Sequence, residues 1–278
     1  MKVLVSCFLI LLLTQCAGEH SGTIQSADGV DIHYKLKGHG DICLIFIHGW
    51  SGTSAIWDDQ VDYFSDKYKV VTIDLPGFGK SGRNRQQWTI DNYGNDVITI
   101  IDKLKLESVV LIGHSMGGLT AMSAATQGSD KIIGLVIVDI VTDIDTYKTK
   151  SWVEDLIATS KVKIRKGNLK DLNEFHVNPE SAQRYSDNLP EEIPDFWWDV
   201  LMLHFDWMND DMKLALTQIN KPIILINSDF TKTDIESIQK YNSSVTVNII
   251  SETAHYLFWD KPIEFNEMLL TSIETKLK

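Results

Sequence analysis

A serine between two glycines follows an apolar run near the middle of the chain. Residues 113–117 have the sequence Gly-His-Ser-Met-Gly, and 109–112 are Val-Val-Leu-Ile. The glycines omit side chains that would collide in a sharp strand-to-helix turn, so this turn would expose the hydroxyl of Ser115. A helix that begins here directs free backbone N–H groups at the site, which places the amide of Met116 to stabilise an oxyanion. The pattern predicts a nucleophile for acyl transfer, and a glycine-rich turn with an uninvolved serine is the alternative.

Strand and helix patterns alternate around this turn from about residue 22 onward. Residues 22–37 predict a hairpin with its turn at 27–29, and the three-to-four spacing of apolar residues over 89–104 predicts a helix. Short Val/Ile-rich runs that are apolar on both faces are typical of central parallel strands covered by helices. Such runs lie at 42–47, 70–73, 109–112, 132–138, 223–226 and 245–250. We therefore expect an α/β fold with a doubly wound, mostly parallel sheet.

The interval 142–219 interrupts this alternation. It has no strand pattern and is longer than an ordinary connection between strands. Its aromatic residues are Trp152, Phe175, Tyr185, Phe196, Trp197, Trp198, Phe205 and Trp207. We interpret it as a helical lid inserted into a core made of residues 19–141 and 220–278. The alternative is a helical subdomain whose aromatic side chains pack together without contacting a substrate.

Several segments together resemble the α/β-hydrolase family. Besides 109–118, these are Ile-His-Gly-Trp at 47–50, Asp-Leu-Pro-Gly-Phe-Gly-Lys-Ser-Gly at 74–82, and the stretch 254–266 around His255. They occur in the family's order and span nearly all of the chain after its amino-terminal segment. The resemblance implies an esterase-like or lipase-like serine hydrolase with a lid, in which the amide of Trp50 is the second oxyanion donor.

The resemblance also distinguishes among the histidines. His255 follows the last predicted strand, where this fold places its catalytic base. A nearby imidazole is the group that can accept the proton of Ser115 at neutral pH and return it to the leaving group. We expect structural support from His48 and His114, and a core or surface role in the lid for His176 and His204. His33 and His39 lie too early in the chain for the family's order of serine, acid and histidine.

The acid that would complete a catalytic triad with Ser115 and His255 is the least determined of the three residues. The family usually carries it three residues after a glycine that follows the strand corresponding to 223–226. In this chain Ser228 occupies the position of that glycine. Thr231 occupies the position of the acid, and threonine has no carboxylate. Some relatives place the acid one strand earlier, where this chain has Asp139. A carboxylate beside His255 would fix its tautomer and stabilise its imidazolium form. Asp139 ranks first, with Asp229 and then Asp234 as alternatives.

The serine nucleophile limits the reactions to be considered. It excludes the chemistry of family members with aspartate at this turn, and Ser115 with His255 suits acyl transfer through an acyl-enzyme. No metal or organic cofactor is needed. The apolar stretch 196–203 predicts a pocket for small to medium hydrophobic esters, with Trp197, Trp198 and Leu201 as pocket residues. Alternatives are peroxide-dependent acyl transfer, carbon–carbon bond hydrolysis, and ligand binding without turnover.

The amino-terminal segment, residues 1–18, predicts export. Met1 and Lys2 precede an apolar run over 3–13 that is too short to span a bilayer. Residues 13–18, Leu-Thr-Gln-Cys-Ala-Gly, resemble the cleavage box of bacterial lipoproteins, in which the cysteine, here Cys16, is lipidated and becomes the new amino terminus. Gln15 departs from the small residue usual before that cysteine. An ordinary cleavable signal is the alternative.

Charge and cysteine content exclude other classes. The chain has 278 residues, 44% of them hydrophobic, and a formal net charge of −12, which disfavours nucleic-acid binding. Cys7 would leave with a signal and Cys16 would carry lipid or leave too, so Cys43 has no partner for a disulfide. No Cys/His spacing resembles a zinc site. The default expectation for the oligomeric state is a monomer.

Overall fold

A computed structural model describes residues 18–172 and 175–277. The predicted signal segment, with Cys7 and Cys16, lies almost entirely outside the described residues. In the part that is described, no helix is both long enough and apolar enough to cross a membrane.

The core of the molecule is one eight-stranded sheet built from the described residues, with the strand order β1-β2-β4-β3-β5-β6-β7-β8. The strands are β1 (His20–Gln25), β2 (Asp31–Gly38), β3 (Ile42–Ile47), β4 (Lys69–Asp74), β5 (Ser108–His114), β6 (Ile132–Val138), β7 (Ile223–Ser228) and β8 (Thr246–Ile250). β2 is antiparallel to β1 and β4, and the remaining pairs are parallel. This confirms the predicted fold class, the hairpin and the position of every predicted strand.

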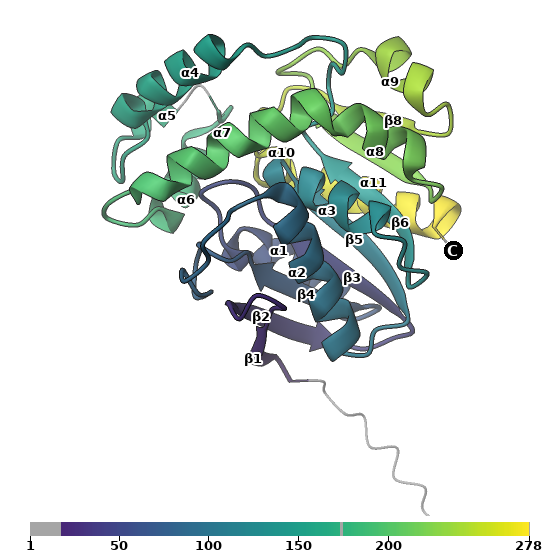
Figure 1. Cartoon of the computed structure of the whole chain (residues 1–278). Helices are drawn as coiled ribbons and strands as arrows, with labels where there is room; N and C mark the ends of the chain where they lie inside the picture. The colour runs from purple at the N-terminus through teal and green to yellow at the C-terminus, as the bar shows by residue number, and fades with distance from the viewer. Residues whose placement is uncertain (1–17, 173–174, 278) are drawn as a thin grey trace, which may run out of the picture.

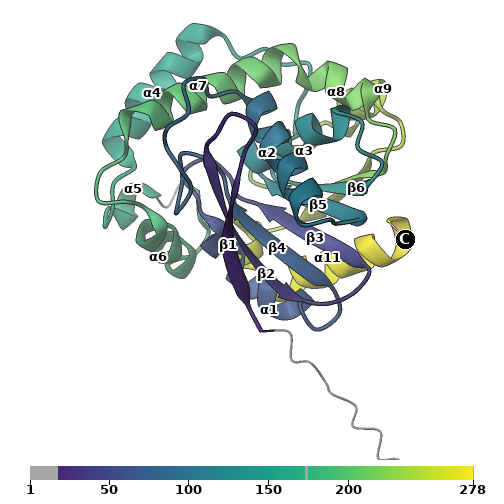
Figure 2. The ribbon, with the colours of Figure 1, turned by 60° about the horizontal axis from the view of Figure 1, so that its bottom comes forward.

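Helices cover both faces of the sheet (Figures 1 and 2), as expected for a doubly wound fold. α2 and α3 lie on one face, and α1 and α11 on the other. The helices of the core are a 3₁₀ turn (Ser54–Trp57), α1 (Asp58–Phe64), α2 (Ile90–Lys103), α3 (Met116–Thr126), α9 (Ile235–Tyr241), α10 (Leu257–Asp260) and α11 (Pro262–Lys276). Thr89 caps α2, because its hydroxyl accepts a hydrogen bond from the amide of Asn92.

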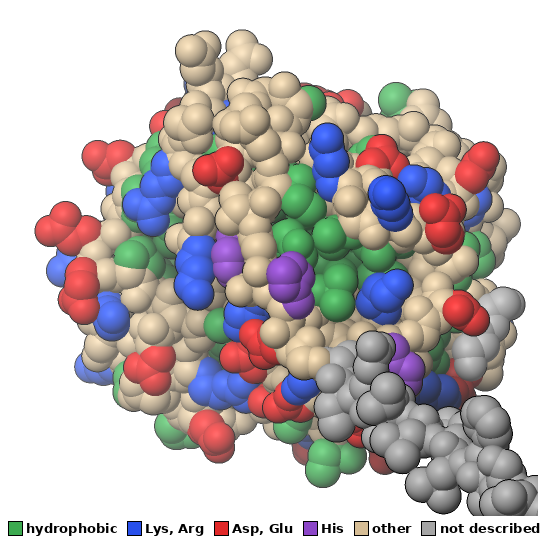
Figure 3. All heavy atoms as spheres, turned by 90° about the horizontal axis from the view of Figure 1, so that it is seen from below, with side chains coloured by type: hydrophobic (Ala, Val, Ile, Leu, Met, Phe, Trp, Pro, Cys, Tyr) green, Lys and Arg blue, Asp and Glu red, His purple; other side chains and the backbone are tan. Residues whose placement is uncertain are grey.

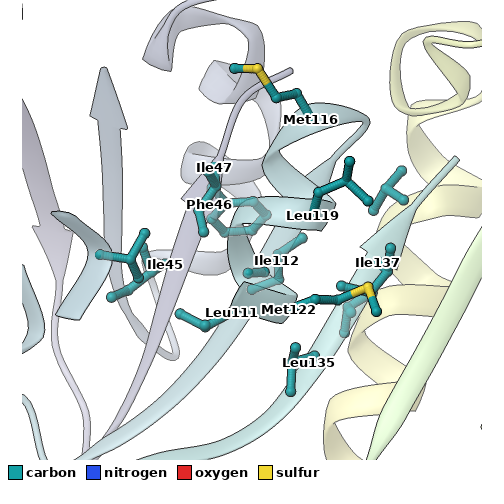
Figure 4. Close-up of a cluster of buried hydrophobic side chains, with 14 of the residues drawn as sticks. Ile45, Phe46, Ile47, Leu111, Ile112, Met116, Leu119, Met122, Leu135 and Ile137 are labelled. Carbon is teal, nitrogen blue, oxygen red and sulfur yellow. The ribbon is translucent and has the colours of Figure 1, made fainter. Parts of the chain in front are cut away.

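The central strands are apolar because both of their faces are covered. Side chains of β3, β5 and β6 pack with Met116, Leu119 and Met122 of α3 in a fully buried cluster (Figure 4). Burial of each such side chain contributes about 1.5–3 kcal/mol to folding. The cluster therefore holds α3, and with it the turn at Ser115, firmly against the sheet.

The described residues of the interval 142–219 form helices and connecting loops, and no strand. They are α4 (Lys150–Lys163), α5 (Leu169–Leu172), α6 (Pro179–Asn188), α7 (Asp195–Asp210) and α8 (Met212–Gln218). We call this interval the insertion. In Figure 1, α4, α6 and α7 lie above the end of the sheet toward which the arrowhead of β6 points. The insertion thus covers the carboxyl ends of the parallel strands, where ligands bind in open α/β sheets.

Polar contacts attach the insertion to the loops of the core. Arg184 of α6 forms an ion pair with Asp59 of α1, at 2.6 Å between Nη1 and Oδ2. The hydroxyl of Ser181 donates to Asp260 at 2.7 Å, and the indole N–H of Trp197 donates to the carbonyl oxygen of Gly77 at 3.0 Å. These contacts fix the insertion over the sheet from several sides.

The face seen from below in Figure 3 has interspersed acidic and basic side chains. On this face the basic residues do not gather into a stripe that could follow a polyanion.

Candidate active site

Ser115 lies in a strained turn between β5 and α3. Its φ of 53° and ψ of −123° are outside the regions that non-glycine residues usually occupy. Gly113 and Gly117 permit the turn, because a Cβ at Gly113 would collide with the carbonyl of Gly117, and one at Gly117 with the carbonyl of Ile47. Strain of this kind costs about 1–3 kcal/mol and is concentrated at functional sites. The turn presents Ser115 to a cavity, as the sequence pattern predicts.

Backbone amides around Ser115 form the second part of the site. Met116 is the first residue of α3, so its N–H has no acceptor within the helix. The loop carrying Trp50 lies close by, since a Cβ on Gly49 would be 3.0 Å from the Cβ of Ser115. A hydrogen bond of 3.1 Å from the amide of Gly52 to the carbonyl of Gly49 closes this loop. The structure therefore places Met116 directly after Ser115, and the loop that carries Trp50 beside it.

His48 stabilises the same loop. Its Nδ1 donates to the carbonyl of Gly49 at 2.7 Å, and its Nε2 accepts from the amide of Leu75 at 2.9 Å. Burial lowers the pKa of His48, which keeps the ring neutral and suited to one donated and one accepted bond.

His255, which follows β8, pairs with Asp139, which follows β6. Nδ1 of His255 donates to Oδ2 of Asp139 at 2.8 Å, and the side chain of Asp139 is only 8% exposed. The other carboxylate oxygen, Oδ1, accepts hydrogen bonds from the amide and the hydroxyl of Ser228. Asp139 has a φ of 51°, and Ser115, His255 and Asp139 all line one cavity. Because Nδ1 is bonded to Asp139, Nε2 of His255 is the ring nitrogen that can exchange a proton with a substrate or with Ser115.

The two alternative acids are engaged elsewhere. Asp229 accepts from the amides of Glu252 and Thr253 at 2.9 and 3.3 Å, and the first of these bonds is the main cause of its lowered pKa. Asp234 caps α9 by accepting from the amide of Ser237. Asp229 therefore orders the loop that precedes His255 and does not contact its ring.

His114 supports His255 from behind. Its Nε2 donates to the backbone carbonyl of His255 at 2.8 Å, and the two ring centroids are 4.5 Å apart. Burial, together with the neighbouring His255, holds the pKa of His114 well below its usual range. A neutral ring at this place orients the backbone of His255.

The cavity beside Ser115 has a volume of about 290 Å³ and lies between the core and the insertion. Much of its wall consists of apolar side chains, among them Ile140, Leu156, Ile164, Leu201, Phe205 and Met208. Polar groups also reach it, including the hydroxyls of Ser51 and Tyr185, which are hydrogen-bonded to each other at 2.8 Å. A second cavity of about 250 Å³ lies beside the first. The two cavities have four lining residues in common, which are Leu156, Ser160, Ile164 and Phe175.

The pocket prediction needs a correction. Of the three residues named from the sequence, Leu201 lines the cavity, whereas Trp197 and Trp198 are not part of its lining. Their rings pack against Trp50, at centroid distances of 6.1 and 5.0 Å. The reason is that α7 crosses the loop of Trp50 with its first turn and reaches the cavity one turn later.

Sequence reasoning missed His204 as a lining residue of the cavity. His204 belongs to the same stripe of α7 as Leu201, Phe205 and Met208, with the spacing of one helical face. That spacing was the available signal. No group of three or more His, Cys, Asp or Glu side chains within the described residues is arranged to hold a metal ion.

Comparisons with known proteins place this geometry in a family. A family model described as the α/β hydrolase fold matches residues 42–262. The bifunctional esterase/perhydrolase DCH of Acinetobacter calcoaceticus is 28% identical over 225 residues, which cover 75% of this chain and 81% of that protein. The non-heme haloperoxidase of Rhodococcus erythropolis is 28% identical over 222 residues, or 74% of this chain and 80% of that protein.

A solved structure supports the fold independently. The esterase EaEST from Exiguobacterium antarcticum superposes with a TM-score of 0.75 at 19% identity, covering 92% of this chain and 100% of the other. Together with the matched family model and the strand order, this shows that the chain belongs to the α/β-hydrolase fold family.

Proposed function

We propose that this protein is a serine hydrolase that cleaves ester bonds through an acyl-enzyme on Ser115. The observation that supports this most is the 2.8 Å hydrogen bond from Nδ1 of His255 to Asp139, in the cavity that Ser115 also lines. The proposed nucleophile, acid and base, Ser115, Asp139 and His255, follow the carboxyl ends of β5, β6 and β8, the edge of the sheet where ligands bind in open α/β folds.

In the first half of the reaction, Oγ of Ser115 attacks the ester carbonyl while its proton passes to Nε2 of His255. Asp139 stabilises the resulting imidazolium. The negative oxygen of the tetrahedral intermediate accepts hydrogen bonds from the amides of Met116 and Trp50, an interaction that is often the largest single contribution to catalysis. The intermediate collapses, and the alcohol leaves with the proton from His255.

In the second half, water replaces the alcohol. His255 takes a proton from the water, whose oxygen attacks the acyl-enzyme, and the carboxylic acid departs as the proton returns to Ser115. The same residues serve both halves.

The substrate we propose is a small to medium hydrophobic ester. The cavity volume of about 290 Å³ is just below the usual range for ligand sites, about 300–1,000 Å³, and much of the cavity wall is apolar. Among its described lining residues there is no Lys or Arg to pair with an anionic substrate. The insertion acts as a lid in this proposal, because it supplies most of the apolar wall.

Peroxide-dependent acyl transfer is a second candidate, and the relatives favour it. One of them is named an esterase/perhydrolase and another a haloperoxidase. In this reaction hydrogen peroxide instead of water attacks the acyl-enzyme, giving a peroxyacid and free Ser115. Assaying ester cleavage with and without peroxide, with detection of the peroxyacid, separates the two candidates.

The test of the proposed function uses a fluorophosphonate probe and mass spectrometry of the labelled peptide. We expect the label on Ser115, and we expect His255→Ala to abolish it, since an unactivated serine hydroxyl does not react. A folded protein that is not labelled would instead support ligand binding without turnover.

The amino-terminal sequence supports a further part of the proposal, export with a lipid anchor on Cys16. The basic start, the short apolar run and the cysteine are the features that favour it. Cells given a labelled fatty acid should incorporate it into the wild-type protein and not into Cys16→Ser. Export without incorporation would indicate an ordinary cleaved signal.

A further inference from the structure

His204 is a buried histidine in the cavity wall with an unused hydrogen-bonding capacity. It lies in α7 and lines the same cavity as Ser115 and His255, and its residue surface is only 3% exposed. Its Nδ1 is enclosed by protein without a hydrogen-bond partner, and its Nε2, which is not enclosed in this way, makes no hydrogen bond to a described residue either. A group in the cavity can therefore reach Nε2 and not Nδ1, and binding sites use such isolated polar groups in an apolar wall to orient a ligand.

The ring of His204 is uncharged. Burial, with a smaller contribution from His255, lowers the pKa of His204 to about 3. A neutral imidazole has one N–H donor and one nitrogen with a free lone pair. A hydroxyl group can pair with Nε2 in either tautomer of the ring, because it both donates and accepts a hydrogen bond. A carboxylate is a poorer match, since the described lining offers no Lys or Arg to balance its charge.

The neighbours of His204 indicate that its partner is a substrate. Along α7, Leu201, Phe205 and Met208 surround it on the cavity side and have no hydrogen-bonding hydroxyl or amide side chains. The hydroxyls of Ser51 and Tyr185 in the same cavity are already paired with each other. The cavity is also lined by the hydroxyls of Thr142, Ser160 and Thr231, and none of these is hydrogen-bonded to His204.

We propose that the substrate is an uncharged ester with an additional hydroxyl group, and that this hydroxyl binds His204. This inference rests on the proposed ester hydrolysis at Ser115 and makes its substrate class more specific. His204 acts here as a specificity-determining residue and takes no part in the proton transfers of His255.

The experiment compares matched pairs of esters that differ by one hydroxyl. Ethyl 3-hydroxybutyrate with ethyl butyrate tests the acyl side, and 3-hydroxybutyl acetate with butyl acetate tests the alcohol side. For the wild-type protein we expect kcat/KM to be about 3- to 10-fold higher for the hydroxylated member of one pair, the effect of one uncharged hydrogen bond.

Three variants of α7 assign the preference to a residue. His204→Leu should bring the ratio of kcat/KM for the hydroxylated and unsubstituted esters to about one, whereas His204→Gln, with an amide, should retain part of the preference. Met208→Leu changes an apolar residue one turn away in the same wall and serves as the matched control, with the preference intact. Circular dichroism verifies that each variant is folded.

The outcomes separate this inference from the proposed function. Cleavage of unsubstituted esters without a hydroxyl preference in either pair would overturn the inference and leave the proposed function standing. A preference that persists in His204→Leu would also overturn it, because another group would bind the hydroxyl. Failure of the wild-type protein to cleave any of the four esters would count against both.

Discussion

Ser228 donates two hydrogen bonds to one carboxylate oxygen of Asp139, at 2.8 Å from its amide and 2.7 Å from its hydroxyl. The residue that departs from the glycine usual in the family therefore contacts the acid directly. With the carboxylate on β6 instead of β7, the end of β7 provides a donor that orients it. The unusual serine and the position of the acid are two parts of one arrangement.

Replacing Ser228 by alanine should lower kcat/KM about tenfold, because one hydrogen bond to a charged acceptor is worth about 1.5 kcal/mol or more. The amide bond of residue 228 remains, so the loss should be partial. Steady-state kinetics on a p-nitrophenyl ester measures it. Unchanged kinetics in a folded variant would show that the hydroxyl has no influence on Asp139.

Asp139→Asn should reduce kcat about 10⁴-fold, the loss that this change causes in a Ser-His-Asp triad when the imidazole adopts the wrong tautomer. Asp229→Asn is the matched control and should cost less than tenfold, since its carboxylate binds only the amides of Glu252 and Thr253. Equal losses in the two variants, or a larger loss at Asp229, would contradict the assignment of the acid.

His114→Phe tests whether His114 positions His255, the proposed catalytic base. The carbonyl of His255 would lose the donor that lies 2.8 Å away, which costs about 1–3 kcal/mol of stability when no other donor replaces it. We expect kcat to fall about tenfold, with a smaller change in KM, because the base is displaced while the apolar wall is retained. A purely structural role for His114 would lower the melting temperature and leave kcat of the folded fraction unchanged.

Buried neutral histidines should make the fold sensitive to acid. Burial, with a contribution from His255, lowers the pKa of His176 to about 3, against 6.5 in a model peptide. Between these values the unfolded chain binds a proton that the folded protein does not, so this contribution to stability is full above pH 6.5 and is lost as the pH falls toward 3. From pH 7.5 to 5.0, the unfolding free energy should fall by about 2 kcal/mol because of His176 alone.

Urea denaturation of His176→Phe at both pH values measures this contribution, and the variant should lose about 2 kcal/mol less than the wild type on acidification. His39→Phe replaces an exposed histidine and should behave like the wild type. An equal pH dependence in all three proteins would contradict a buried neutral His176.

The strands and the turn at Ser115 could be predicted from the sequence because they depend on local pattern. Apolar runs marked the parallel strands, and the glycines at 113 and 117 marked a turn in which a Cβ would collide with backbone. His255 could be found because it follows the last strand.

The acid and the cavity wall depend on how distant segments meet. Asp139 and Asp229 both follow strands, and only the fold shows which one approaches the ring of His255. In α7, Trp197 and His204 share one apolar stripe, and the position of the loop of Trp50 under the first turn decides that His204 and not Trp197 lines the cavity. The spacing of apolar residues predicts which face of a helix is buried. It does not predict which turn along that face lies at the cavity.

The insertion leaves the core after β6 and returns at β7, and these neighbouring strands pair directly, with Val138 opposite Ile226. Because these strands are parallel, the insertion leaves from the carboxyl end of β6 and returns to the amino end of β7, and α8, which packs on α3, lies on this return path. A different helical segment ahead of α8 could replace α4 to α7 without changing the strand order that positions Ser115, Asp139 and His255. In the proposed function, the replaceable helices select the substrate, while the strands carry the residues that break the bond. The crossover from β6 to β7 then makes the protein modular, with one scaffold for chemistry and an exchangeable segment for specificity.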